Sequence, residues 1–360
     1  MLVPLSEKSE FWSFLNLFSY TSVRTICALF TSFLISVFIG ESLIHFLRLK
    51  QGKGQPIRKD GPQGHLEKVG TPTMGGLLIL MTLTIGTLLW SDITTGYVWA
   101  ALFITLVFGI IGFTDDYLKV AKQNPDGLPG KLRLTLEFLA AAIATLWIMS
   151  LQPDNLSSHI SIPSFKNMLI DLGWLFVPFA MIVIVGAGNA VNFTDGLDGL
   201  AAVPVAIVAA VFGIISWVVG NAVLSEQLYL YYIPNARELS VFCGALIGAS
   251  MGFLWFNAPP AKVFMGDTGS LALGGALGAI SIITKHELIL AIAGGLFVLE
   301  AASVIIQVIS YKTTGKRVFM MAPIHHHFEK KGWAESTVVI RFWIISIILA
   351  LIALSTLKIR

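Results

Sequence analysis

The stretch of sequence that decides the fold covers residues 96–119 and reads GYVWAALFITLVFGIIGFTDDYLK. The part before the two acids carries no charged residue, and a bilayer-spanning helix needs roughly 20 mostly apolar residues. Two neighbouring acids, Asp115 and Asp116, follow this apolar run directly. The stretch therefore predicts a transmembrane helix over residues 96–115 that ends in a pair of acids at the membrane surface.

The composition of the whole chain extends this prediction. Of its 360 residues, 55% are hydrophobic and only 12% are charged, whereas soluble domains have about 25% charged residues. The net charge of +3 is too small to indicate a nucleic-acid partner. Cys27 and Cys243 lie within apolar runs, which is typical of small buried side chains and not of a disulfide. We therefore expect an integral membrane protein.

Ten apolar segments along the chain are long enough to cross a bilayer. The runs are continuous and do not alternate, which excludes a β-barrel. We predict an all-α polytopic membrane protein with about ten transmembrane helices, in a single domain over residues 1–360. The predicted spans cover residues 22–47, 73–91, 96–115, 132–151, 168–188, 199–219, 239–257, 266–284, 288–310 and 338–358.

The positions of lysine and arginine predict the orientation, because cytoplasmic loops carry an excess of both. Most of the 24 such residues lie in the segments 48–71, 115–133 and 311–341. We expect these segments to be cytoplasmic, so that both termini are periplasmic.

The two acids at 115 and 116 are the first of five unusual motifs. Neighbouring carboxylates repel each other unless a cation neutralises them. Adjacent side chains on a helix point about 100° apart, so one acid can face a metal while the other faces a substrate. The alternative is a solvated helix end.

The second motif, GNAVNFTDGLDG at 188–199, lies between the fifth and sixth predicted spans. It is rich in glycine and short polar side chains but has no lysine or arginine. Asn189 and Asn192 are three residues apart, as are Asp195 and Asp198, so each pair can share a helix face. We favour ligand binding; the alternative is a turn in which Asp198 caps the sixth span.

Two further motifs also suit phosphate chemistry. FMGDTGS at 264–270 opens the eighth span, and the free N–H groups of a helix start bind phosphate well; the alternative is Asp267 as a simple N-cap. APIHHHFEKKGW at 322–333 carries His325, His326 and His327, which suggest phosphate binding or proton handling. A zinc site is the alternative there.

The remaining polar features are weaker. KVGTPTMGG at 68–76 leads into the second span and offers Lys68 to a phosphate and Thr73 as a hydrogen-bond donor. Glu300 and Gln307 lie on one face of the ninth span. We favour a polar pair packed against another helix; the alternative is a functional role, which an ionisable residue inside a membrane span suggests. Gly294-Gly295 permits a bend in that span.

The predicted topology brings all of these motifs to the cytoplasmic side. Several carboxylates beside basic and histidine groups, with no cysteine among them, indicate a site for Mg²⁺ or Mn²⁺ bound to phosphate. No phosphate-binding glycine loop of the Walker type is present, so a nucleotide would be held through its metal.

These motifs, in this order, resemble the polyprenyl-phosphate N-acetylhexosamine-1-phosphate transferase superfamily over essentially the whole chain. The three-histidine motif makes the chain most similar to its phospho-N-acetylmuramoyl-pentapeptide transferases. The resemblance implies transfer of phospho-MurNAc-pentapeptide from UDP-MurNAc-pentapeptide to undecaprenyl phosphate, giving lipid I and UMP. It also implies Mg²⁺, a homodimer and a location in the bacterial inner membrane.

The resemblance assigns roles residue by residue. It implies catalytic roles for Asp115, Asp116, Asp267, Lys131 and His325, with the three aspartates as metal ligands. It implies substrate contacts for Lys68, Thr73, Asn189, Asn192, Asp195, Gly196, Leu197, Asp198, Asn257, Phe264, His326 and His327.

Several alternatives stay open at this point. A sister enzyme would use another donor, such as UDP-GlcNAc, and a transporter or flippase is the alternative from another class. Transfer can be direct or can pass through a phosphorylated aspartate. We expect an apolar groove for the lipid tail at a bent ninth span. Which of Asp115 and Asp116 acts as base is not decided.

Overall fold

Nine helices are long and apolar enough to span a membrane in the computed structural model, which describes residues 2–3, 13–52, 70–123, 126–163 and 168–358. The predicted polytopic and largely helical membrane protein is thereby confirmed, whereas the predicted count of about ten spans is not: the second predicted span, 73–91, corresponds to the shorter apolar helix Gly76–Trp90. The described elements are η2 (Ser13–Ser19), α1 (Thr21–Gln51), α2 (Gly76–Trp90), α3 (Gly96–Lys122), α4 (Gly130–Leu151), β1 (His159–Ser161), β2 (Leu169–Asp171), η4 (Gly173–Leu175), α5 (Phe176–Thr194), α6 (Ala202–Val219), α7 (Ala222–Gln227), η5 (Ala236–Glu238), α8 (Leu239–Asn257), α9 (Gly266–Thr284), α10 (Glu287–Ala293), α11 (Gly295–Thr314), α12 (Ile324–Lys330) and α13 (Glu335–Thr356).

The fifth predicted span is the main error in the boundaries. We predicted it over 168–188, but residues Leu169–Asp171 form β2, which pairs antiparallel with β1, and α5 covers Phe176–Thr194. The polar residues at 189–194 therefore belong to the helix and not to a loop. Helix α5 can carry them because its last turn faces polar side chains of other helices and not lipid.

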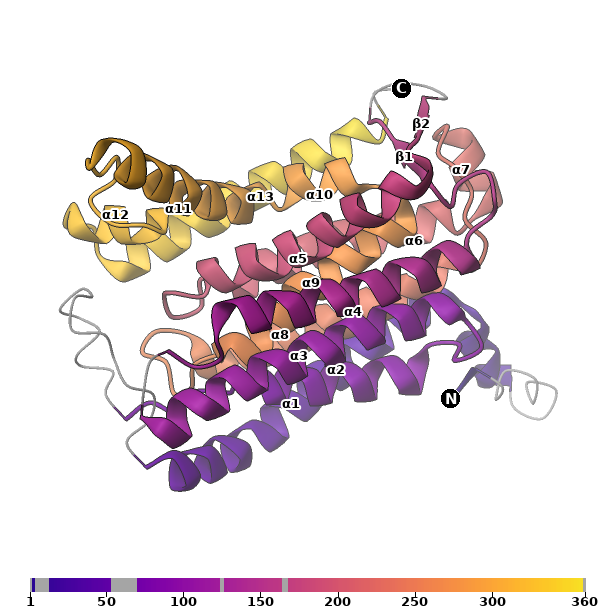
Figure 1. Ribbon diagram of the computed structural model, residues 1–360. Coiled ribbons are helices and arrows are strands. Elements are labelled where there is room, and N and C mark those ends of the chain that lie inside the picture. The colour runs from indigo at the N-terminus through magenta and orange to yellow at the C-terminus, as the bar shows by residue number, and fades with distance from the viewer. Residues whose placement is uncertain (1, 4–12, 53–69, 124–125, 164–167, 359–360) are drawn as a thin grey trace.

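Helix α9 lies at the centre of the bundle (Figure 1). Its apolar window is 89% buried, and α2, α3, α4, α5, α6 and α10 all pack against it. Its sequence is rich in glycine and alanine, and such small residues let neighbouring helices approach closely. A side chain at Gly274, for example, would overlap the Ala187 carbonyl oxygen of α5.

The ninth predicted span is broken where the two glycines predicted a bend. Helix α10 ends at Ala293 and α11 begins at Gly295. Glycine tolerates the backbone change that such a break needs. The break separates a short buried segment from α11, whose outer side exposes apolar residues such as Leu299 and Ile309.

The two ends of the bundle differ in chemistry (Figure 1). Helix α1 begins and α13 ends at one end, whereas α3 ends, α9 begins and α12 lies at the other. The described lysines 119, 122 and 131 belong to this second end. The positions of the helices thus agree with termini that share one side, and the side itself stays a prediction.

A buried ion pair holds the first end together. Arg24 of α1 donates hydrogen bonds to both carboxylate oxygens of Glu238, at 2.6 and 2.7 Å, and to the Trp90 carbonyl oxygen at 3.1 Å. The Asp92 amide also donates to Glu238, at 2.9 Å. The two charges thereby join α1, the end of α2 and the start of α8.

We expect Glu238→Gln to destabilise the protein by about 3–5 kcal/mol, because it leaves the buried Arg24 guanidinium without its counter-charge. Thermal unfolding in detergent micelles measures the effect as a lower transition temperature. The matched control is Glu41→Gln. Glu41 is exposed and faces Lys262 at 3.9 Å, so that substitution should change stability by about 1 kcal/mol or less. Equal transition temperatures for the two variants would contradict the role of the Arg24 pair.

Candidate active site

Three aspartates that are far apart in sequence meet at the basic end of the bundle. Asp115 and Asp116 lie near the end of α3, and Asp267 lies in the first turn of α9. Carboxylate oxygens of all three lie within 4.8 Å of one another. Asp115 and Asp116 are buried and Asp267 is half-buried. Hard oxygen donors at this spacing, without a thiolate, suit a divalent cation such as Mg²⁺.

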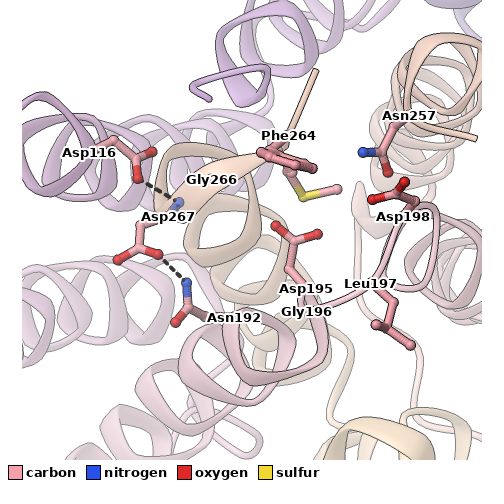
Figure 2. Close-up of a pocket in the computed structure, with 11 residues that line it drawn as sticks. Asp116, Asn192, Asp195, Gly196, Leu197, Asp198, Asn257, Phe264, Gly266 and Asp267 are labelled. Atoms are coloured by element: carbon pink, nitrogen blue, oxygen red, sulfur yellow. Dashed lines mark hydrogen bonds between the residues drawn. The ribbon is translucent and has the colours of Figure 1, made fainter. Parts of the chain in front are cut away.

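Asp116 caps the N-terminus of α9 from a neighbouring helix. Its carboxylate accepts hydrogen bonds from the amides of Asp267 and Thr268, at 3.1 and 2.9 Å, and from the Thr268 hydroxyl at 2.7 Å. Figure 2 shows the first of these bonds. A helix start has unsatisfied N–H groups and a positive dipole end, so a carboxylate is favourable there. Asp116 therefore fixes the position of the first turn of α9, which carries Asp267.

Asp267 is not a simple N-cap, the alternative that the sequence left open. Its side chain faces the site, where Lys119 and Arg133 contact one oxygen at 3.1 and 3.0 Å. Asn192 donates to the other oxygen at 2.8 Å (Figure 2). Lys119 also pairs with Asp115 at 2.5 Å. Three carboxylates thus share two cationic side chains, which leaves negative charge for a divalent ion to neutralise.

A second line of contacts ties α4 to α5 behind these groups. Arg133 donates to the Asn189 side-chain oxygen at 3.0 Å, and Asn189 donates to Glu137 at 2.6 Å. The expected cation, Lys131, is exposed at the start of α4. Among the described residues, Lys119 and Arg133 contact Asp267.

Lys119, Arg133 and Glu137 are site residues that the sequence motifs do not predict. A signal existed for Lys119, since a lysine four residues after Asp115 shares its helix face. In the sequence, Arg133 is only one of the basic residues that predict which loops are cytoplasmic. The buried Glu137, an ionisable residue within a predicted span, was also a signal.

A cavity of about 210 Å³ lies beside the three aspartates. Figure 2 shows Asp116 and Asp267 on one side of it, with Phe264 and Asp195 facing each other across it. Seven of the residues to which the resemblance assigns substrate contacts line this cavity; they are Asn192, Asp195, Gly196, Leu197, Asp198, Asn257 and Phe264. With Asp116 of α3 and Asp267 of α9, the lining comes from four separate parts of the chain, at residues 116, 192–198, 257 and 264–267.

Asp195 gives the cavity an unusual carboxyl group. Its burial, together with the nearby negative charges of Asp267 and Asp116, raises its pKa well above the usual value for aspartate. A neutral carboxyl group at this position can donate a hydrogen bond as well as accept one.

Asp198 and Asn257 hold the cavity wall. Asp198 accepts a hydrogen bond from the Ala261 amide at 3.0 Å. Asn257 accepts one from the Gly199 amide at 2.9 Å and donates one to the Val263 carbonyl oxygen, also at 2.9 Å. The interpretation of Asp198 as the cap of the sixth span is wrong, because α6 begins only at Ala202 after a turn.

The three histidines of α12 point to different partners. His325 is buried against Glu300 of α11, with 3.1 Å between Nδ1 and Oε1. His326 contacts Glu329 at 2.6 Å, and the Nδ1 atom of His327 accepts a hydrogen bond from the Met320 amide at 3.1 Å. The side chains diverge, which argues against one zinc ion bound by all three. His325 lies behind Gly196 and does not itself line the cavity.

The motif before α2 holds Phe264 through its backbone: the Phe264 amide donates to the Pro72 carbonyl oxygen at 2.9 Å, and the Gly75 amide donates to the Phe264 carbonyl oxygen at 2.8 Å. Gln51 holds the Thr73 main chain with two hydrogen bonds of 2.9 Å. The Thr73 hydroxyl is buried and has no hydrogen-bond partner among the described residues. It lies beside Gly266, whose positive φ of 73° suits glycine. Lys68 lies outside the described residues.

Comparison with known proteins places the chain among its relatives. The Glycosyl transferase family 4 matches residues 98–285, and phospho-N-acetylmuramoyl-pentapeptide-transferase signature 1 matches residues 68–80. The phospho-N-acetylmuramoyl-pentapeptide-transferase of a Ruegeria species is 58% identical over the full length of both chains. The chain belongs to the phospho-N-acetylmuramoyl-pentapeptide-transferase family. The enzyme of that name from Ruegeria pomeroyi is also 58% identical, over 359 residues that cover 99% of its length.

In this member of the transferase family, the acidic site depends on close contact between α3 and α9. Gly112 of α3 leaves room for the start of α9, and a methyl group there would overlap the Asp267 carbonyl oxygen. Gly76 of α2 approaches the Gly269 backbone in the same way.

We expect Gly112→Ala to separate α3 from α9 and to lower transferase activity by about 10-fold or more, because small misplacements of reacting groups are costly. Steady-state rates measure the loss. The control is Gly130→Ala at the start of α4, where a methyl group has open space, and which should keep its activity. Full activity in Gly112→Ala would show that the two helices can separate without affecting the site.

Proposed function

We propose that this chain transfers phospho-MurNAc-pentapeptide from UDP-MurNAc-pentapeptide to undecaprenyl phosphate and releases UMP and lipid I. The observation that carries the proposal is the group of three aspartates beside a cavity, within a full-length member of the transferase family. The family supplies the identity of donor and acceptor, and the geometry supports the division of roles.

Asp267, Asp115 and Asp116 are the residues that would hold Mg²⁺, since their oxygens already lie within 4.8 Å of one another. The ion would offset the charge of the two phosphates of the donor. Lys119 and Arg133 add positive charge at the same place. We assign Lys131, at the exposed start of α4, to the leaving phosphate of UMP.

The cavity supports binding of the uridine end of the donor. The ring of Phe264 forms one wall (Figure 2), where it can stack on the base. Asp195 and Asn192 offer hydrogen bonds near the aspartates, and Lys68 and Thr73 are assigned to the donor phosphates. We assign His326 and His327 of α12 to the phosphates or the sugar.

The two neighbouring acids of α3 have different surroundings, which favours separate roles. Both oxygens of Asp116 already accept hydrogen bonds from α9, so Asp116 positions Asp267. Asp115 is held by the Leu128 amide at 2.7 Å and by Lys119, and we assign it to the acceptor phosphate. An acceptor oxygen then attacks the sugar-linked phosphorus, and the phosphorus–oxygen bond to UMP breaks with its electron pair going to UMP.

An apolar cavity of about 320 Å³ supports a site for the lipid tail. Helices α5, α9, α10 and α11 line it, next to the break in the ninth predicted span, with residues such as Val183, Leu277, Phe297 and Ala301. Glu287, at the start of α10, also lines it. A largely uncharged wall suits an isoprenoid chain.

The charge distribution supports a cytoplasmic site in the inner membrane. The basic end of the bundle is the end that carries the aspartates and α12, and cytoplasmic surfaces are enriched in lysine and arginine. A soluble nucleotide donor would be available on that side. We retain the homodimer as a further part of the proposal.

Release of UMP from purified protein in detergent, with Mg²⁺ and undecaprenyl phosphate, tests the proposed function. We expect turnover with UDP-MurNAc-pentapeptide and none with UDP-GlcNAc. Asp267→Asn should lower the rate by about 100-fold or more, since it removes a charge at the transferring phosphates. It should also weaken Mn²⁺ binding measured by electron paramagnetic resonance. Asp154→Asn, at an exposed position on the other end, is the matched control. Transfer from UDP-GlcNAc alone would establish the sister activity instead.

We expect Ala301→Phe to raise the KM for undecaprenyl phosphate by about 10-fold while the KM for the nucleotide donor changes little, because the larger ring fills the apolar groove. Steady-state kinetics with each substrate varied in turn separate the two constants. A matched control is Leu299→Phe, which lies on the exposed side of α11. A rise in the nucleotide KM alone would place the lipid tail elsewhere.

A further inference from the structure

A carboxyl group and an imidazole form a fully buried pair between α11 and α12. The side chains of Glu300 and His325 are both 0% exposed, and Nδ1 of His325 lies 3.1 Å from Oε1 of Glu300. The second oxygen of Glu300 has no hydrogen-bond partner among the described residues. Burying an acid in a membrane-spanning helix is costly, and such residues usually serve a function. The proposed transfer chemistry assigns no role to Glu300.

The other side of the His325 ring meets the wall of the nucleotide cavity. Its Nε2 atom points at Gly196, and a methyl group on Gly196 would overlap that atom. Gly196 itself lines the cavity, between Asp195 and Leu197. The imidazole therefore forms the support directly behind this part of the wall.

We propose that Glu300 is a positioning residue for the donor site: it fixes the proton and the orientation of His325, and His325 in turn holds the segment 195–198 against the cavity. The inference rests on the proposed function, because it concerns the segment assigned to the nucleotide. Glu300 is not among the residues that line the cavity, and its carboxylate contacts the ring of His325.

The chemistry of the pair explains how this would work. An ionised carboxylate only accepts hydrogen bonds, so with Glu300 ionised the proton between the two groups would lie on Nδ1 of His325. A second residue that binds one ring nitrogen of a functional histidine fixes both its tautomer and its ring orientation. The His326 ring, 4.1 Å from the His325 ring centre to centre, packs beside it.

A second polar residue of α11 shows how a structural contact differs. Gln307 accepts hydrogen bonds from the amides of Val318 and Phe319, at 3.0 and 2.9 Å, and donates one to the Phe319 carbonyl oxygen at 3.0 Å. It holds the main chain of the following loop. Glu300 instead contacts a side chain that leads to the cavity wall. The two residues, expected from the sequence to act as a pair, have different partners.

A double-mutant cycle tests the proposal through the kinetics of transfer. Glu300→Leu should lower kcat/KM by about 10–100-fold, the usual effect of removing a residue that orients a functional histidine, with most of the loss in the KM for the nucleotide. Glu300→Gln, which keeps an acceptor oxygen, should retain more activity. In the His325→Ala background, Glu300→Leu should cause no further loss. If the fold losses in kcat/KM of the two single variants multiply in the double variant, the two residues act independently and the proposal is overturned. Residues that act through each other give free-energy changes that do not add.

Ser303→Ala serves as the matched control for this cycle. Ser303 is buried one turn further along α11, and its hydroxyl donates a hydrogen bond to the Glu300 carbonyl oxygen of its own helix at 2.7 Å. It should leave the kinetic constants unchanged. A loss in Ser303→Ala as large as that in Glu300→Leu would indicate a general effect of altering this helix, and would also overturn the proposal.

Nitrogen-15 NMR of histidine-labelled protein tests the same pair without any turnover. The signals that disappear in His325→Ala identify the ring, and wild-type protein should show a protonated Nδ1. Glu300→Leu should change these shifts, and Ser303→Ala should not. An unprotonated Nδ1 in the wild type would overturn the proposal even if every variant folds poorly. If wild-type protein released no UMP, the proposed function would be wrong. The NMR measurement would still show whether Nδ1 of His325 carries the proton beside Glu300.

Discussion

The hydrogen bonds between Asp116 and the first amides of α9 are the contact on which the site depends. These bonds, of 3.1 and 2.9 Å from the amides and 2.7 Å from the Thr268 hydroxyl, join the last third of α3 to the beginning of α9. Because the cap comes from a different helix, the side chain of Asp267 is not needed for it and can face Lys119, Arg133 and Asn192. A capping interaction of ordinary strength thereby sets the spacing of the acidic group.

That contact requires helices which approach one another very closely. Gly112 and Gly76 leave space at the first turn of α9, and glycines further along α9 do the same for α3 and α5. The acids are thus placed by the packing of rigid helices, as is favourable for groups that must keep their relative positions. The segments of the cavity wall that lie outside the helices are held in place by hydrogen bonds such as those of Asp198 and Asn257.

The sequence was sufficient for much of this arrangement because membrane spans and charged motifs leave strong local patterns. The seventh predicted span agrees with α8 at both ends, and the bend at Gly294-Gly295 is confirmed. Contacts between side chains of different helices leave no such local pattern in the sequence. Neither the contact of Arg133 with Asp267 nor that of Glu300 with His325 has any sequence spacing to reveal it. The polar end of α5 was misplaced because hydropathy alone assigns such residues to loops.

The break between α10 and α11 also bears on how an acceptor would arrive. The groove beside it is lined by apolar residues, and the outer side of α11 exposes Leu299 and Ile309. For the proposed acceptor, the route to the site runs sideways within the membrane plane, and the polyprenyl chain never has to enter water. Its supply is then governed by lateral diffusion and by its mole fraction among the lipids, while the donor is supplied from solution in three dimensions. The enzyme would thus sample its two substrates in compartments of different dimensionality.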